Sequence, residues 1–218
     1  MRNKKGQFIS PKKQVVANSF SPMTMTNYRG VKKHLADRPE WDDLLINSGL
    51  FKFAGSSDPT WRTWTIDCVD FQALSFDDED EIFFTCQLPH TYKEGTDIRA
   101  HVHWTPKARG NEEINKYVGW KLDVSWANIN GDPFTSVATI DMTDKCSGTD
   151  DYHEVSAGST NIDGTGKKIS SMLVCRLYRD DSEVIEYWEG TGVNAPALLQ
   201  FDFHHEVNSM GSSIEWVK

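Results

Sequence analysis

Features that define several large classes of protein are absent from this sequence. Its four cysteines (Cys68, Cys86, Cys146 and Cys175) are widely spaced, with no CxxC pair and no zinc-ribbon spacing. Cys86 and Cys175 lie in apolar runs, which favours buried free thiols over a disulfide framework. No apolar run approaches the roughly 18 residues of a transmembrane helix, and we expect no secretory signal because the N-terminus lacks an apolar core region. A membrane protein is therefore not predicted.

Motifs of common catalytic sites are also missing. The sequence has no GxSxG element to raise a nucleophilic serine. The DGTG turn at 163–166 lacks the spacing of a phosphate-binding loop. The acidic run at 77–81 is typical of a solvated turn before a strand. The sequence therefore predicts no enzymatic activity.

Charge is divided unevenly along the 218 residues. The chain has 23 basic and 32 acidic residues, a net charge of −9. Residues 1–33 hold 8 of the basic residues and no acidic one, which leaves 15 basic against 32 acidic residues, or −17, for the remainder. Residues 1–33 also lack periodicity, so we expect an extended N-terminal arm before one domain at 34–218.

The basic arm is the part of the chain that we expect to anchor it to a partner. Because duplex affinity depends on neutralising phosphates, the acidic domain argues against nucleic-acid binding. DNA contact by the arm ranks second to contact with a protein surface. The predicted anchoring residues are Lys4, Lys5, Lys12, Lys13, Arg29, Lys32 and Lys33.

Beyond residue 48 the apolar residues alternate with polar ones, which is typical of strands with one buried face. The clearest runs are 97–104, 117–126 and 197–207, and shorter ones occur at 60–67, 81–88, 134–142, 172–179 and 183–189. Residues 34–48 are expected to form a short turn or helix. So many short strands, with no helical alternation, predict an all-β fold: an antiparallel β-sandwich of jelly-roll type.

Alternation also assigns faces within the run at 197–207. It places Leu199, Phe201 and Phe203 toward the core, and Asp202 and His204 on the opposite face. The polar residues of this run are therefore candidates for a site on the sheet surface.

Two histidines in the run at 97–104 form the most specific local pattern. His101 and His103 are two residues apart, so on a strand both imidazoles project from one face and can reach one metal ion. With Gly95 they resemble the first half of the cupin metal motif. The positions where that motif carries glutamate hold Lys107 and Ala108.

The third metal ligand in this interpretation is His204, with Asp202 or Glu206 beside it. The predicted site for a divalent metal is thus His101, His103 and His204. The alternative is that these histidines make polar contacts on a sheet face or between subunits.

Trp61 and Trp64 are three residues apart in one short strand-like run, so they cannot both face one core. We expect one of them to be exposed or covered by another chain. A surface tryptophan is typical of protein interfaces and of carbohydrate platforms.

Several motifs together resemble a group of small β-rich virion structural proteins of tailed bacteriophages and prophages. The resemblance begins near residue 41 and continues to the C-terminus, in the same order throughout. It rests on PHTYKEG at 89–95, HVHW at 101–104, WKLDVSWA at 120–127, GKKISSMLVCRLYR at 166–179, LLQFDFH at 198–204 and GS at 211–212.

The resemblance implies a structural part of a virion with no established enzymatic activity, and no catalytic residue is carried over from it. The leading hypothesis is a head-decoration, head-fibre-base or neck/tail accessory protein. It would form a homo-oligomer, with a trimer favoured, anchored by its arm to a capsid, neck or tail subunit in the virion. It would need no cofactor. The alternative hypothesis is a cupin-like metal-binding or carbohydrate- or receptor-binding module that uses the HVH strand.

Overall fold

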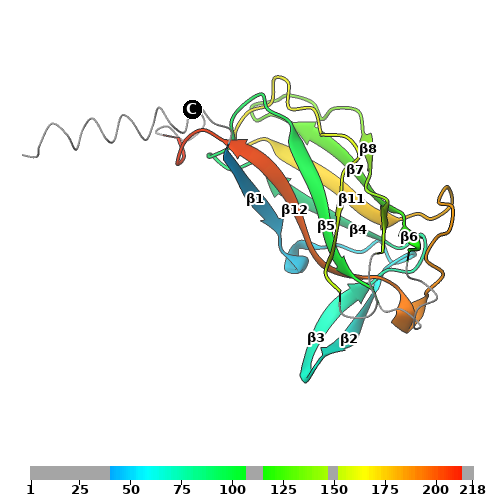
Figure 1. Cartoon of the computed structure of the whole chain (residues 1–218). Coiled ribbons are helices and arrows are strands. Elements are labelled where there is room, and N and C mark those ends of the chain that lie inside the picture. Colours follow the sequence, from blue (N-terminus) through cyan, green and yellow to red (C-terminus); the bar gives the residue numbers. More distant parts are fainter. Residues whose placement is uncertain (1–39, 107–114, 147–151, 213–218) are drawn as a thin grey trace, which may run out of the picture. The chain divides into compact units, whose positions relative to one another are not determined.

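A computed structural model describes residues 40–106, 115–146 and 152–212 (Figure 1). The arm predicted at 1–33, with its seven predicted anchoring residues, lies outside these ranges. The strands are β1 (Glu40–Ile46), β2 (Thr60–Ile66), β3 (Val69–Ser75), β4 (Glu81–Gln87), β5 (Ile98–Thr105), β6 (Tyr117–Val118), β7 (Trp120–Ala127), β8 (Ala138–Asp141), β9 (Asp144–Lys145), β10 (Glu154–Ala157), β11 (Met172–Arg179) and β12 (Ala197–Val207). Two single-turn 3-10 helices, η1 (Ser48–Leu50) and η3 (Gly192–Asn194), complete the described elements.

Ten of the twelve described strands form two antiparallel sheets that pack face to face, and β6 and β9 form a separate two-stranded sheet. One sheet has the order β10-β5-β12-β3-β2, with β1 also paired to β12, and the other has the order β4-β11-β7-β8. When the eight strands that build the sandwich are numbered in chain order, the two sheets have the orders 1-8-3-6 and 2-7-4-5. These eight strands are β3, β4, β5, β7, β8, β10, β11 and β12. Pairing first with eighth, second with seventh, third with sixth and fourth with fifth defines a jelly roll. The predicted fold class is confirmed.

Aromatic side chains fill the space between the sheets. Trp104 of β5 and Trp120 of β7 are completely buried, from opposite sheets. Phe84 of β4 contacts Phe201 of β12 across the sandwich, with ring centroids 5.1 Å apart. Cys86 is also buried here as a free thiol, as predicted. The inward alternation read from the sequence thus builds one continuous core.

Strand β12 lies in the middle of the six-stranded sheet and contains a bulge. Leu198 pairs with Trp104, but the next paired residue is Gln200, opposite His103, so Leu199 is extra. Leu199 is consequently exposed, and the prediction that it faces the core is wrong. The bulge marks the point where the other edge of β12 changes partner, from β3 to β1. The Gln200 side chain bonds the carbonyl of Ile46 there (2.8 Å).

The prediction of a turn or helix at 34–48 is wrong for its described part. Residues 40–46 form β1, which pairs with β12 from Glu40 opposite Val207 to Ile46 opposite Phe201. Most of its side chains are exposed because β1 is an edge strand, so the period-2 signal of a buried face is missing.

Three other strand predictions need correction. The run at 183–189 forms no strand, and Ile185 within it is 84% exposed. The run at 134–142 is a strand only over β8. The run at 117–126 divides into β6 and β7 at Gly119, where a Cβ would lie 2.1 Å from the Asp180 carbonyl oxygen. Strands β3, β9 and β10 were not predicted.

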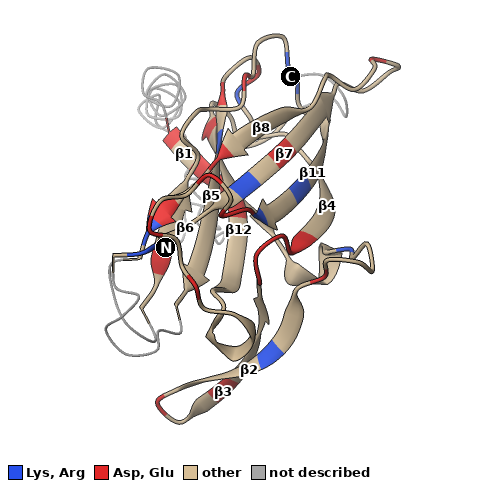
Figure 2. Ribbon diagram, turned by 90° about the vertical axis from the view of Figure 1, so that its right-hand side faces the viewer, with Lys and Arg blue, Asp and Glu red and all other residues tan. Residues whose placement is uncertain are grey.

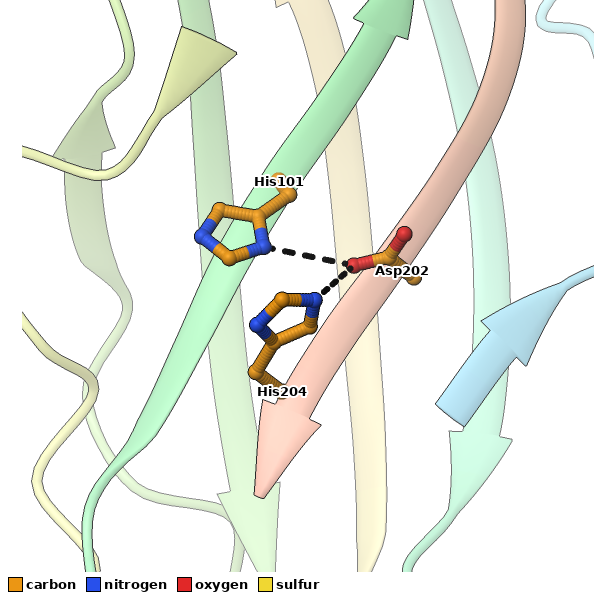
Figure 3. A group of neighbouring side chains, drawn as sticks. All are labelled: His101, Asp202 and His204. Atoms are coloured by element: carbon orange, nitrogen blue, oxygen red, sulfur yellow. Dashed lines mark ion pairs between the residues drawn. The ribbon is translucent and has the colours of Figure 1, made fainter. Parts of the chain in front are cut away.

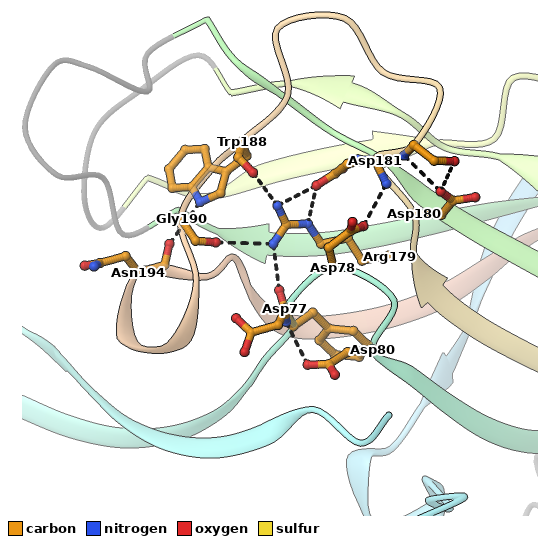
Figure 4. A network of polar contacts seen from close by, with 12 residues as sticks. Asp77, Asp78, Asp80, Arg179, Asp180, Asp181, Trp188, Gly190 and Asn194 are labelled. Carbon is orange, nitrogen blue, oxygen red and sulfur yellow. Dashed lines mark hydrogen bonds and ion pairs between the residues drawn. The ribbon is translucent and has the colours of Figure 1, made fainter. Parts of the chain in front are cut away.

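A buried arginine joins two loops at one end of the sandwich, and its acidic partner reaches a third segment (Figure 4). The Arg179 guanidinium, at the end of β11, donates to Asp181 Oδ2 (2.8 Å), to the Phe76 carbonyl (2.9 Å) and to the Trp188 carbonyl. The other Asp181 oxygen accepts the Gly119 amide (2.7 Å). Burial raises the pKa of Asp181 although Arg179 lies beside it. These contacts tie Trp188, which lies in the run predicted as a strand at 183–189, to the end of β11.

The outer face of the four-stranded sheet carries ion pairs of another kind. Arg176 of β11 pairs with Glu81 of β4 and, at 3.3 Å, with Asp123 of β7. Figure 2 shows the charged segments on these three neighbouring strands. The Arg176 side chain is 38% exposed, so water screens its ion pairs.

The two arginines should differ in their effect on stability. We expect Arg179→Met to lower the free energy of unfolding by about 3–5 kcal/mol, because it leaves Asp181 and two carbonyls buried without their donor. The matched control Arg176→Met should cost about 1 kcal/mol or less. Urea unfolding of both variants measures the difference. Equal losses would contradict a structural role for the Arg179 network.

Candidate metal centre

A cluster of histidine and aspartate side chains lies on the outer face of the six-stranded sheet (Figure 3). Its base is a cross-strand pair, because His101 of β5 stands directly opposite Asp202 of β12. His204 lies two residues farther along β12 and therefore projects from the same face. The neighbouring inward residues Val102 and Phe203 are completely buried in the core. The backbone of two central strands thus fixes the cluster.

The three side chains converge on one carboxylate oxygen. His101 Nδ1 and His204 Nε2 each lie 3.5 Å from Asp202 Oδ1. The two imidazole rings are nearly perpendicular, with centroids 3.9 Å apart. One ligand atom from each residue lies within 4.8 Å of the other two. Within the described ranges, no other group of three His, Cys, Asp or Glu side chains has this arrangement.

Asp202 is a buried acid on the surface of a sheet. Its side chain is only 3% exposed, covered by the imidazoles around it. Asp202 Oδ1 and His101 Nδ1 are both buried and have no hydrogen-bond partner. Burial without a partner costs free energy for a neutral polar group and more for a charged one. Binding of a cation or a proton between these atoms would therefore stabilise the cluster.

A chain of two further histidines holds the second oxygen of Asp202. His103 Nε2 lies 2.9 Å from Asp202 Oδ2, and His103 Nδ1 lies 2.8 Å from His153 Nε2. If His103 is neutral and donates from Nε2, its Nδ1 accepts, and His153 must donate from Nε2. This arrangement fixes the carboxylate of Asp202 and leaves Oδ1 directed at His101 and His204.

His204 has a second acidic neighbour from β1. Its Nε2 lies 2.9 Å from Asp43 Oδ1, and Asp43 pairs with His204 in the strand register. Partial burial, followed by the proximity of His101, lowers the pKa of His204 although two carboxylates are near. The neutral imidazole is therefore favoured, and it is the form that binds a metal ion.

The structure changes the ligand set that the sequence predicts. It brings His101 and His204 together as expected, with Asp202 as the third member. His103 does not join them but bonds the far side of the carboxylate. Glu206, the other acid considered, pairs instead with Lys93 at 2.6 Å.

The structure adds two residues to the cluster that sequence reasoning missed. Asp43 lies on β1, which was not predicted as a strand, and His153 immediately precedes the short strand β10. Both reach the cluster only through strand pairing. An HxH pattern beside a DxH pattern signals the central residues, but no local pattern signals these two.

The two tryptophans of β2 lie in different environments. Trp61 is 46% exposed, and Trp64 is 2% exposed in a small cluster with Ala73 and Ala197. Trp61 is therefore available for contact with another molecule, and Trp64 is not.

Comparison of the sequence with known proteins assigns no role to these residues. No protein-family model and no curated protein sequence matches the chain. Among the described residues, no helix has the length and hydrophobicity needed to cross a membrane.

The cluster should be dispensable for folding. In the presence of chelator, we expect the double variant His101→Val/Asp202→Val to unfold within about 1 kcal/mol of the unsubstituted chain, because valine suits a strand and removes a buried charge. Phe201→Ala, the core-facing neighbour, is the control and should lose about 3–5 kcal/mol. Chemical denaturation compares them. A loss in the double variant as large as the control's would mean that the cluster is structural.

Proposed function

We propose that the protein is a non-enzymatic structural component of a bacteriophage virion. The observation that carries the proposal is the jelly-roll topology together with the placement of the resembling motifs in it. HVHW lies in β5, WKLDVSWA is β7, and LLQFDFH lies in β12. These segments supply the central strands of both sheets. Jelly rolls are a common architecture of viral capsid proteins, and also of lectins and cupins.

Exposed apolar side chains support assembly into an oligomer. On the outer face of the six-stranded sheet, β1 presents Trp41 and Leu45, which are 45% and 61% exposed. Arg99 of β5 lies over the Trp41 ring, 5.0 Å from its centroid. Trp61 of β2 is also exposed, but it stands opposite the buried Leu74 and is not part of this outer surface. Large exposed aromatic and aliphatic residues next to an arginine are typical of protein interfaces.

The basic arm supplies the proposed anchor. Eight basic residues in 33 positions, with no acid, complement an acidic protein surface such as that of another subunit. A segment that becomes ordered on docking loses entropy, and many copies in one assembly offset that loss through avidity.

Neutralising the arm should release the protein from particles without unfolding it. The variant changes Lys4, Lys5, Lys12, Lys13, Arg29, Lys32 and Lys33 to serine. We expect its circular dichroism spectrum and unfolding midpoint to match those of the unsubstituted chain, and its co-sedimentation with virions to be lost. If the unsubstituted chain never co-sediments with particles, the proposal fails.

Disrupting the apolar surface of β1 should weaken self-association. We expect Trp41→Ser/Leu45→Ser to weaken oligomer formation by about tenfold or more, because it removes two exposed apolar side chains from the contact. The control is Val174→Ser, an exposed apolar residue on the outer face of the other sheet. Sedimentation velocity measures both. A monomeric unsubstituted chain would contradict the oligomer.

A further inference from the structure

We propose that His101, Asp202 and His204 bind one divalent transition-metal ion of the Zn²⁺ class. This inference does not depend on the virion role, since it rests on the geometry of the outer face of the six-stranded sheet. It differs from the site predicted by the sequence, because Asp202 replaces His103 among the ligands.

Two of the three distances between the ligand atoms match tetrahedral coordination. With metal–ligand bonds of about 2.0–2.2 Å, the atoms of two ligands in a tetrahedron stand about 3.3–3.6 Å apart. His101 Nδ1 and His204 Nε2 each lie 3.5 Å from Asp202 Oδ1. The remaining pair, one nitrogen from each imidazole, lies within 4.8 Å. The three atoms are therefore close enough to surround one ion on this face of the sheet.

The unpartnered atoms are an independent indication of a ligand. Asp202 Oδ1 and His101 Nδ1 are buried, lack hydrogen-bond partners and belong to the set that converges. Figure 3 shows both imidazoles turned toward the same oxygen. One bound cation would accept lone pairs from both unpartnered atoms and neutralise the carboxylate.

The donor types select the class of metal. Two imidazole nitrogens and one carboxylate oxygen suit zinc and its neighbours in the first transition row. Calcium and magnesium prefer six or more oxygen ligands, including water, which this group does not provide. Asp43 stands nearest to fill the fourth position, since its Oδ1 lies 2.9 Å from the same His204 nitrogen.

His103 acts as a positioning residue in this site. By bonding Asp202 Oδ2 at 2.9 Å, it leaves Oδ1 as the single oxygen that faces the ion. His153 orients His103 in turn through the 2.8 Å contact between their rings. Histidines and carboxylates around metal ligands commonly have this role.

Isothermal titration of the full-length, chelator-treated chain with Zn²⁺ tests the site. We expect one high-affinity Zn²⁺ per chain. His101→Ala and Asp202→Ala should weaken binding by about 100-fold or more, and His103→Ala by about tenfold with the stoichiometry kept. The control is His90→Gln, which removes an imidazole that bonds Ser170 and Ser212 away from the cluster, and its affinity should be unchanged.

A second measurement separates loss of ligands from loss of fold. The unfolding midpoint of the unsubstituted chain and of His90→Gln should rise on addition of Zn²⁺, and that of Asp202→Ala should not. All variants must show the same circular dichroism spectrum in chelator, and His101→Val/Asp202→Val replaces any alanine variant that does not fold. Absence of Zn²⁺ uptake by the unsubstituted chain, or uptake unchanged in the ligand variants, overturns the site. Complete loss in His103→Ala overturns its positioning role.

Discussion

The pairing of β12 with three other strands is the constraint on which the rest of the six-stranded sheet depends. One edge of β12 pairs with β5, and the other pairs first with β3 and then with β1. Because side chains alternate along a strand, this register determines two surfaces at once. Phe201 and Phe203 enter the core, and Asp202 and His204 stand on the outer face. The core and the candidate metal centre therefore cannot be positioned independently.

Among the residues that the structure describes, two buried carboxylates are satisfied to very different degrees. Asp181 receives bonds from Arg179 and from the backbone amide of Gly119. Asp202 has one oxygen bonded by His103 and one with no hydrogen-bond partner. A fully bonded network stabilises a fold, whereas a buried polar atom without a partner costs free energy that a bound cation would offset. Because of this contrast, we propose metal binding at Asp202 and a stabilising role for Asp181.

Sequence reasoning succeeded where one face of a strand is buried and failed where pairing alone makes the strand. The alternation in β5, β7 and β12 predicted the jelly roll, and the HxH spacing predicted that His101 would face its sheet surface. Strand β1 has no such alternation because it is an exposed edge, so its residue Asp43 could not be placed. His103 was grouped with His101 and His204, yet it bonds the other oxygen of Asp202, because spacing gives the shared face of two side chains but not which neighbour each one reaches. The neighbours come from register, which depends on long-range pairing.

The extra residue at Leu199 has a consequence for the face on which the acid of this site stands. The bulge shifts the pairing of β12 with β5 by one residue, so Asp202 stands opposite His101 rather than Ala100. Ala100 faces the core. If Leu199 instead paired regularly with His103, Asp202 would stand opposite Ala100 and face the core, whereas deletion of Leu199 would leave Asp202 opposite His101. The bulge therefore lets β12 carry one more residue between the core contacts of Leu198 and the acid without turning that acid away from the sheet surface.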